Sequence, residues 1–460
     1  MIDQIITGVY LLIILAVGIY AGRKVKTMED FSVAGRNMPF YIIFATLSAS
    51  FIGGGFSMGN AEKVFLFGIA NIFALFGFSL KEILVAKFIA PRMYNYSDCI
   101  TVGDIIGNHY GKAAKMLTGV LSLIVCAGIL GAQIGAIGYI FNVFLGIDVL
   151  YGIIIGCGIV ILYSTIGGMK SVVITDVIQF IVLVIGIPLV LIFGVYHAGG
   201  WTNVINAVPD KHLSIFGNMP VMAFVSLFLT FLVGETLVPP YMQRLLISKD
   251  TKALQLGTML SGLLSIVFFS ITGLIGLVAY ALFPTVDANL AMPHMIMTIL
   301  PIGVKGIVIA GVISIVMSSA DSFLNSAAVA AVNDIVKPIF RDSEKAGALW
   351  IARLFTVIVG LGAVLFAINI KSVLDILLYS YNFWAPIILV PLIAALFDIK
   401  ATKGQFFASA LAGALGVYVW KFILPNQYNI DGLLVGLLAS FLVFTYYAFF
   451  EKHEDNPPSA

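Results

Sequence analysis

The chain has 460 residues, of which 60% are hydrophobic and only 10% are charged, and its formal net charge is +2. Soluble domains carry about 25% charged residues, so this composition excludes a soluble globular enzyme and indicates a membrane protein in a lipid bilayer. The nearly balanced charge gives no field that would attract nucleic acid. The five histidines and three cysteines are scattered without metal-ligand or C-x-x-C spacing, which argues against structural zinc and disulfides.

Apolar runs predict an all-α polytopic fold with about thirteen transmembrane helices, because one spanning helix needs roughly 20 apolar residues. The runs cover residues 6–22, 40–62, 67–93, 114–145, 149–168, 170–197, 220–245, 254–283, 304–331, 346–368, 371–398, 405–424 and 431–450. Eighteen Lys and Arg residues fall on one side of these helices and five on the other, with two inside spans. Positive residues favour the cytoplasmic side, so we expect the N-terminus outside and the C-terminus inside.

Two segments contain helix-breaking residues at membrane depth. The second has three glycines at 53–55, and the seventh has Gly234, Glu235 and the pair Pro239 and Pro240. Such backbone is tolerated in a membrane only where it lines a cavity or is buried in protein. Interrupted segments five spans apart predict an inverted five-plus-five repeat with a binding site at the breaks. Two kinked helices packed through small residues are the alternative.

This pattern divides the chain into six parts. We expect an extra N-terminal helix and cytoplasmic loop at 1–39, repeats at 40–197 and 220–398 separated by an outer loop at 198–219, two peripheral helices at 399–450 and a cytoplasmic tail at 451–460.

Charged residues inside the spans mark candidate cation sites. Four acids lie there, namely Glu82, Asp176, Glu235 and Asp321. One charge at a helix centre costs roughly 2.5–3.5 kcal/mol, so these acids are expected to face a cavity or a cation. Around Asp321 the sequence SSADS at 318–322 combines hydroxyl and carboxylate oxygens, which suit a hard cation such as sodium. Close helix packing through serines is the alternative.

Other polar residues in the spans leave two interpretations open. Lys81 and Glu82 are adjacent, hence about 100° apart on a helix, and fit an interhelical pair or snorkelling as well as solute contact. Gln133 is either a packing hydrogen-bond partner or a solute ligand. Four residues near the outer half of segment eleven could form a gate or an aromatic belt: Tyr379, Tyr381, Asn382 and Trp384.

Three motifs resemble the sodium:solute symporter family, and the similarity runs from about residue 5 to 450. They are YSTIGGMKSVVITDVIQ at 163–179, YMQRLLISKDTKA at 241–253 and SSADSFLNS at 318–326. The resemblance implies a leucine-transporter-type fold and secondary active symport. The segment FIGGGFSMGNAEKVF is also similar to the choline-transporter branch. Phe51 and Val238 stand where that branch has tryptophans, however, so an aromatic cage for choline is not expected.

The resemblance also implies site residues. A sodium ion would bind the hydroxyls of Ser318 and Ser319 and the carbonyls of Ile315, Phe44 and Leu47. A second sodium site, found in some family members, would use Asp176, Ser318 and Ser322, with Asp321 standing where the family frequently has serine. The solute site would be lined by Ser50, Phe51, Asn71, Gln133, Glu235 and Tyr241.

These features predict a symporter of the cytoplasmic membrane, functional as a monomer, that imports a small polar organic solute by alternating access. One or two sodium ions would drive it, and proton coupling through Asp176, Asp321 and Glu235 is the alternative. A channel would show no accumulation against a gradient. An intramembrane hydrolase would need a nucleophile with its base or a cluster of metal ligands, and a pump would need a P-loop; the sequence indicates none of these.

Overall fold

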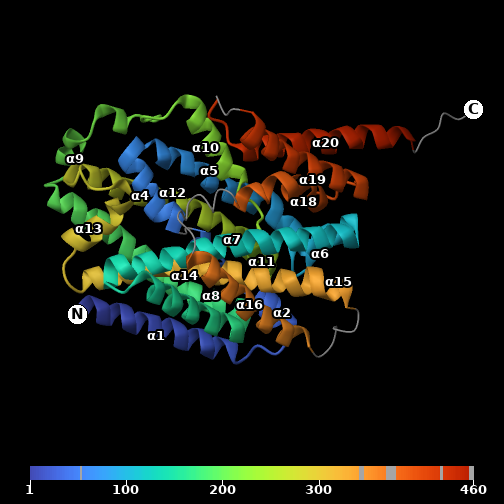
Figure 1. Ribbon diagram of the computed structural model, residues 1–460, viewed down its shortest axis with the longest axis horizontal. Helices are drawn as coiled ribbons and strands as arrows, with labels where there is room; N and C mark the ends of the chain where they lie inside the picture. Colours follow the sequence, from blue (N-terminus) through green and yellow to red (C-terminus); the bar gives the residue numbers. More distant parts are fainter. Residues whose placement is uncertain (52–53, 341–346, 369–379, 425–427, 455–460) are drawn as a thin grey trace, which may run out of the picture.

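The computed structural model describes residues 1–51, 54–340, 347–368, 380–424 and 428–454, and within them the fold is helical, with a single isolated bridge between Met38 and Ser248. Figure 1 labels the helices, whose bounds are α1 Ile2–Gly22, α2 Met28–Val33, α3 Phe40–Phe51, α4 Gly54–Phe67, α5 Ala70–Leu84, α6 Val102–Tyr110, α7 Lys112–Leu145, α8 Val149–His197, α9 Trp201–Ala207, α10 Val221–Val233, α11 Pro239–Leu246, α12 Thr251–Leu282, α13 Ala291–Ile299, α14 Val304–Ala330, α15 Lys337–Ile339, α16 Ala348–Ile368, α18 Val390–Leu396, α19 Lys403–Tyr418 and α20 Gly432–Glu454.

Helix α14 is the centre of the bundle. Every residue from Val308 to Ala330 is buried, because α14 packs against α1, α7, α8 and α16. A helix that is apolar on most sides and covered all round belongs to the interior. Helices α1 and α16 instead leave large apolar side chains such as Leu12 and Leu365 exposed, as a lipid-facing surface requires. The serine-rich stripe of α14 therefore lies deep in the protein, where each polar group needs a partner.

Seven described helices are long and apolar enough to cross a membrane, or up to eight if the bent pair α3 and α4 forms one span. They make the chain a multi-pass membrane protein. The count of thirteen, the inverted repeat and the orientation stay predictions. The expected runs 149–168 and 170–197 form the long helix α8, which kinks at Gly168 with φ 50° and ψ −141°. A Cβ at this position would lie 2.4 Å from the carbonyl oxygen of Phe31, so the close turn requires glycine.

Both segments with helix-breaking residues are interrupted. Helices α3 and α4 are bent by 49° relative to each other. Helix α10 ends at Val233 and α11 begins at Pro239, with Leu237 between them in the left-handed region at φ 55°. Prolines suit the first turn of α11, where their missing N–H groups would have had no intrahelical partner. The end of α10 and the start of α11 therefore lie inside the bundle, as does the bend between α3 and α4.

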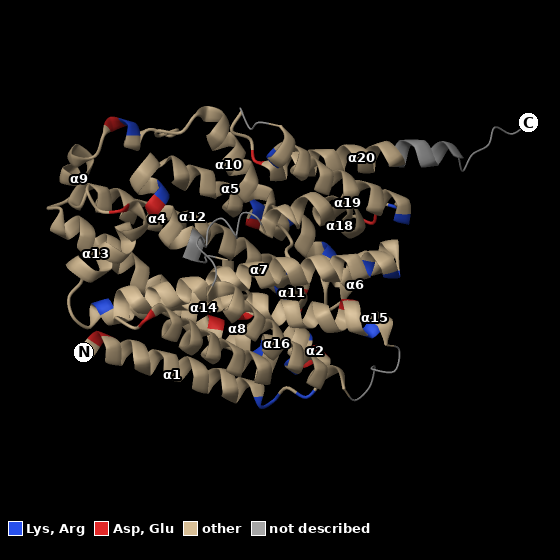
Figure 2. Cartoon of the chain, in the orientation of Figure 1, with Lys and Arg blue, Asp and Glu red and all other residues tan. Residues whose placement is uncertain are grey.

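Charged residues gather toward the two ends of the bundle and are sparser between them (Figure 2). Helix α1 begins at one end, and α20 extends to the other (Figure 1). This distribution is expected for a protein whose middle lies in hydrocarbon, where an unpaired charge is costly. The few charges in the middle are therefore the informative ones.

Candidate functional site

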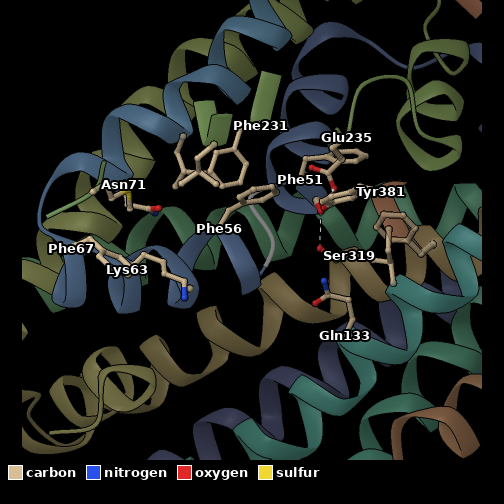
Figure 3. Close-up of a pocket in the computed structure, with 17 residues that line it drawn as sticks. Phe51, Phe56, Lys63, Phe67, Asn71, Gln133, Phe231, Glu235, Ser319 and Tyr381 are labelled. Atoms are coloured by element: carbon tan, nitrogen blue, oxygen red, sulfur yellow. Dashed lines mark hydrogen bonds between the residues drawn. The ribbon is translucent and has the colours of Figure 1, made fainter. Parts of the chain in front are cut away.

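A cavity of about 220 Å³ lies beside the two breaks, between α3, α4, α5, α7, α10 and α14. It is smaller than the roughly 300–1,000 Å³ of pockets for drug-sized ligands, so it suits a small solute. Five of the residues predicted to contact the solute line it: Ser50, Phe51, Asn71, Gln133 and Glu235. Figure 3 places Glu235, Phe51 and Tyr381 together at one end, and Lys63, Phe67 and Asn71 at the other.

Tyr241 was also predicted to contact the solute, but it does not line the cavity. Its side chain is fully buried, its ring packs edge-on against that of Phe51 at 5.1 Å, and its hydroxyl donates to Glu82 Oε2 at 2.9 Å. The short helix α11 turns Tyr241 toward α5, so Phe51 stands between it and the cavity. In this structure Tyr241 supports the cavity wall and does not form it.

Lys81 and Glu82 pair with each other, although they are sequence neighbours. The ammonium of Lys81 lies 2.8 Å from Glu82 Oε1, and both side chains are 1% exposed. The rings of Phe78 and Tyr241 cover the ammonium at 3.7 and 4.5 Å from their centroids, which adds cation–π attraction. Both charges are thus compensated behind the cavity wall. Neither snorkelling nor an interhelical ion pair describes them.

Glu235 lies in the break between α10 and α11, where it reaches the cavity. Tyr381 donates its hydroxyl to Glu235 Oε1 at 2.9 Å. Within the described part of the chain Glu235 Oε2 has no hydrogen-bond partner, and the residue is 6% exposed. The indole of Trp384 is fully buried and donates to the carbonyl of Thr236 at 3.3 Å. Trp384 therefore does not belong to an aromatic belt and Tyr381 faces the cavity, while Tyr379 lies outside the described residues.

Ser319 touches the end of the first broken helix. Its hydroxyl donates to the carbonyl of Ser50 at 2.7 Å and to that of Ile315 at 3.3 Å. Helix α3 is described as far as Phe51, so Ser50 lies in its last described turn. Phe44 and Leu47 lie in earlier turns of the same helix. Their carbonyls stay predicted sodium ligands, and the carbonyl of Ser50 is a further candidate beside them.

Sequence reasoning did not single out Arg244, which lies within the motif at 241–253. This side chain is fully buried and its Nη2 lies 3.0 Å from Asp176 Oδ2. The guanidinium also donates to three hydroxyl groups, those of Thr46, Ser50 and Ser322. Ser318 donates to the other oxygen of Asp176 at 2.5 Å. The guanidinium therefore lies among the oxygens that resemblance assigned to a second sodium ion. One signal could have indicated Arg244: the predicted spans contain four acids but only two basic residues.

Asp321 faces away from Arg244 toward α8. Its Oδ2 accepts from Tyr163 at 2.5 Å and its Oδ1 accepts from Ser322 at 3.1 Å. Both side chains of the Tyr163–Asp321 pair are fully buried. Ser322 connects the two acids indirectly, because it donates to Asp321 and accepts from Arg244, the partner of Asp176. Among the described residues, only Asp176 of these two acids has a cationic partner.

No cluster of three or more His, Cys, Asp or Glu residues with metal-ligand geometry occurs among the described residues. Cys99, Cys126 and Cys157 are all buried and free, as small apolar residues would be. The site consists of hydroxyls, backbone carbonyls and single carboxylates, which are ligands for a hard monovalent cation rather than for zinc.

A buried cavity beside two interrupted segments, with carboxylates, hydroxyls and backbone carbonyls inside a lipid-facing bundle, defines a membrane transporter of small solutes. The chain belongs to the sodium:solute symporter family, whose model matches residues 31–413. It is therefore a transporter and not an enzyme, with sodium as its coupling ion.

Individual relatives agree with this assignment. The osmoregulated proline transporter OpuE of Bacillus subtilis is 25% identical over 90% of this chain and 87% of its own length. The human high affinity choline transporter 1 is 27% identical over 88% of this chain and 73% of its own length. Among solved structures, an outward-open, substrate-bound Na⁺-coupled sialic acid symporter has a TM-score of 0.84 at 19% identity, covering 98% of both chains. That likeness shows the leucine-transporter-type fold.

Proposed function

We propose that the chain imports a small polar organic solute across the cytoplasmic membrane, driven by sodium and working by alternating access. The observation that carries this proposal is the contact between Ser319 and the carbonyl of Ser50. It joins α14 to the end of α3, so a cation held there would bridge the central helix and the first broken helix. The relatives transport proline and choline by their names, which is consistent with a small organic solute.

The sodium ion is proposed to bind the Ser319 hydroxyl together with the carbonyls of Ile315 and Ser50. In this arrangement the hydroxyl rotates, so its oxygen faces the ion instead of donating to the carbonyls. Arg244 supplies the positive charge at Asp176, so the predicted second site does not need a sodium ion. We therefore expect a stoichiometry of one sodium per solute.

Alternating access would exchange two states of the bundle, of which sodium favours one by its differential affinity. The inverted repeats at 40–197 and 220–398 are the units proposed to move against each other around the breaks. One sodium ion entering down 100 mV contributes about 2.3 kcal/mol, and tenfold accumulation of a neutral solute requires about 1.4 kcal/mol. A single ion is therefore sufficient to drive more than tenfold accumulation, with the protein acting as a monomer.

Sodium binding can be tested before the solute is known. Purified protein in detergent should gain thermal stability when NaCl replaces KCl at constant ionic strength, because a ligand that binds the folded state stabilises it. Ser319→Ala should abolish this gain. Ser314→Ala is the matched control, since Ser314 lies on the same helix but bonds to Tyr10 and to the carbonyl of Ala310. An equal sodium response in wild type and Ser319→Ala would contradict the site.

Proton coupling is the second candidate, and Asp321 favours it. This carboxyl group is fully buried with two hydroxyl partners and no cationic one among the described residues. Burial without a countercharge favours a bound proton. Solute uptake into proteoliposomes driven by a pH gradient without sodium would support this candidate over the first. Uptake that requires sodium at every pH would reject it.

A further inference from the structure

Glu235 is the carboxylate at the end of the cavity beside Phe51 and Tyr381. Only one of its two oxygens has a hydrogen-bond donor among the described residues. Glu235 Oε1 accepts from Tyr381, whereas Oε2 has no hydrogen-bond partner in the part of the chain that the structure describes, and the residue is 6% exposed. A buried carboxylate oxygen without a donor is costly. We therefore look for the partner of Glu235 Oε2 among the solutes that could enter the cavity.

The cations near this end of the cavity are already engaged. Lys81 pairs with Glu82 at 2.8 Å under aromatic rings, and Arg244 pairs with Asp176 at 3.0 Å. Neither of these two cations lines the cavity. Lys63 does line it, but at the opposite end in Figure 3, where its ammonium lies 3.4 Å from Glu62. Together the six central groups, Lys81, Glu82, Arg244, Asp176, Asp321 and Glu235, carry two positive and four negative charges when ionised. The end of the cavity at Glu235 therefore favours an incoming cation.

A helix end adds to this preference. Helix α10 has 13 residues and ends at Val233, two residues before Glu235. The C-terminal end of a helix carries a partial negative charge. The end of α10 therefore reinforces the field of the carboxylate, and an anionic group placed here would be repelled.

The rest of the wall is apolar and aromatic. Phe51, Phe56, Phe231 and Tyr381 line the cavity. Figure 3 shows Phe51 and Tyr381 beside Glu235, with Phe56 and Phe231 farther along the cavity. Aromatic faces attract ammonium groups and cover apolar solute carbons. A carboxylate surrounded by rings thus matches a charged nitrogen attached to a small apolar body.

We propose that the solute carries a positively charged nitrogen, which binds Glu235 Oε2 among the rings of Phe51, Phe231 and Tyr381. Amino acids, amines and quaternary ammonium compounds belong to this class. Monocarboxylates without an amino group, free sugars and sialic acids do not. The inference rests on the proposed transport function and names the solute class for the same cavity.

The test uses the full-length protein purified in detergent with sodium present. Thermal shifts identify binders in a panel of amino acids, biogenic amines, choline, lactate, glucose and N-acetylneuraminate, and titration gives their affinities. We expect stabilisation by one or more compounds with a charged nitrogen. Glu235→Gln should weaken that binding at least about tenfold, equivalent to about 1.4 kcal/mol, and Glu235→Asp should recover part of it. Glu29→Gln, an exposed acid beside Arg36, is the control.

Three outcomes would overturn the solute class: tightest binding of an anionic or neutral compound, no binding of any compound with a charged nitrogen, or an affinity in Glu235→Gln within twofold of wild type. The sodium response without solute is measured on the same samples. We expect this response in the wild type. Its absence there would contradict the proposed sodium coupling, while the comparison of solutes would still decide the role of Glu235.

Discussion

Asp176 and Glu235 are both buried acids in predicted membrane spans, but they differ in the number of their hydrogen-bond partners. Asp176 accepts from Arg244, Thr46 and Ser318, so its charge is compensated from within. Of the residues that the structure describes, only Tyr381 donates to Glu235, and one carboxylate oxygen has no donor among them. The first arrangement holds helices together, and the second is prepared for a ligand. The number of internal partners, rather than burial alone, separates the structural acid from the one that binds.

The largest effect is expected from removing the cation at Asp176. Arg244→Gln should destabilise the protein by about 3–5 kcal/mol, because it leaves a buried carboxylate without its countercharge. Denaturant unfolding of the purified protein measures this loss. The double variant Asp176→Asn with Arg244→Gln should recover most of it. Lys249→Gln, at an exposed pair 3.9 Å from Asp250, is the control and should change little. A loss below about 1 kcal/mol in Arg244→Gln would contradict the structural role.

Asp321 should give the next largest effect. Tyr163→Phe removes the donor that lies 2.5 Å from Asp321 Oδ2, and hydrogen bonds to charged groups contribute about 1.5–3 kcal/mol. Tyr110→Phe removes a neutral bond of 2.9 Å to the carbonyl of Pro391 and should cost only about 0.5–1.5 kcal/mol. Equal losses of stability in the two variants would indicate that Asp321 is protonated, as proton coupling requires.

Neutralising each acid separates their roles most directly. Glu235→Gln should leave the solute-free protein within about 1 kcal/mol of wild type or stabilise it, because it removes a half-partnered buried charge. Asp176→Asn should destabilise it, since Arg244 would lose its countercharge. Unfolding of both variants under the same conditions compares them. Destabilisation by Glu235→Gln as large as that by Asp176→Asn would end the distinction drawn between the two acids.

The smallest effect concerns the orientation of Glu235. Tyr381→Phe removes the hydroxyl that fixes Oε1 but leaves the carboxylate and the aromatic ring in place. We expect the affinity for the solute to fall by about twofold to tenfold, since one hydrogen bond contributes about 0.5–1.5 kcal/mol. The same titration that identifies the solute measures this change. A loss as large as that of Glu235→Gln would mean that Tyr381 itself binds the solute.

Much of the architecture could be predicted from the sequence, because a membrane restricts backbone to helices and makes charges rare. Apolar runs predicted where the helices lie, and the helix-breaking residues at 53–55 and 239–240 predicted which two segments are interrupted. Five of the six residues expected at the solute site line the cavity. Tyr241 was misplaced because the direction of a side chain after a broken helix depends on where the next helix starts, which residue spacing does not give.

The sequence by itself determined that this chain is a transmembrane helix bundle with two interruptions and a few buried acids, since composition and helix-breaking residues are local properties. Only the tertiary structure decided which acid is paired. Arg244 and Asp176 are 68 residues apart, and Tyr381 and Glu235 are 146 apart. The electrostatic environment of a buried charge depends on such distant neighbours, and packing around α14 brings them together.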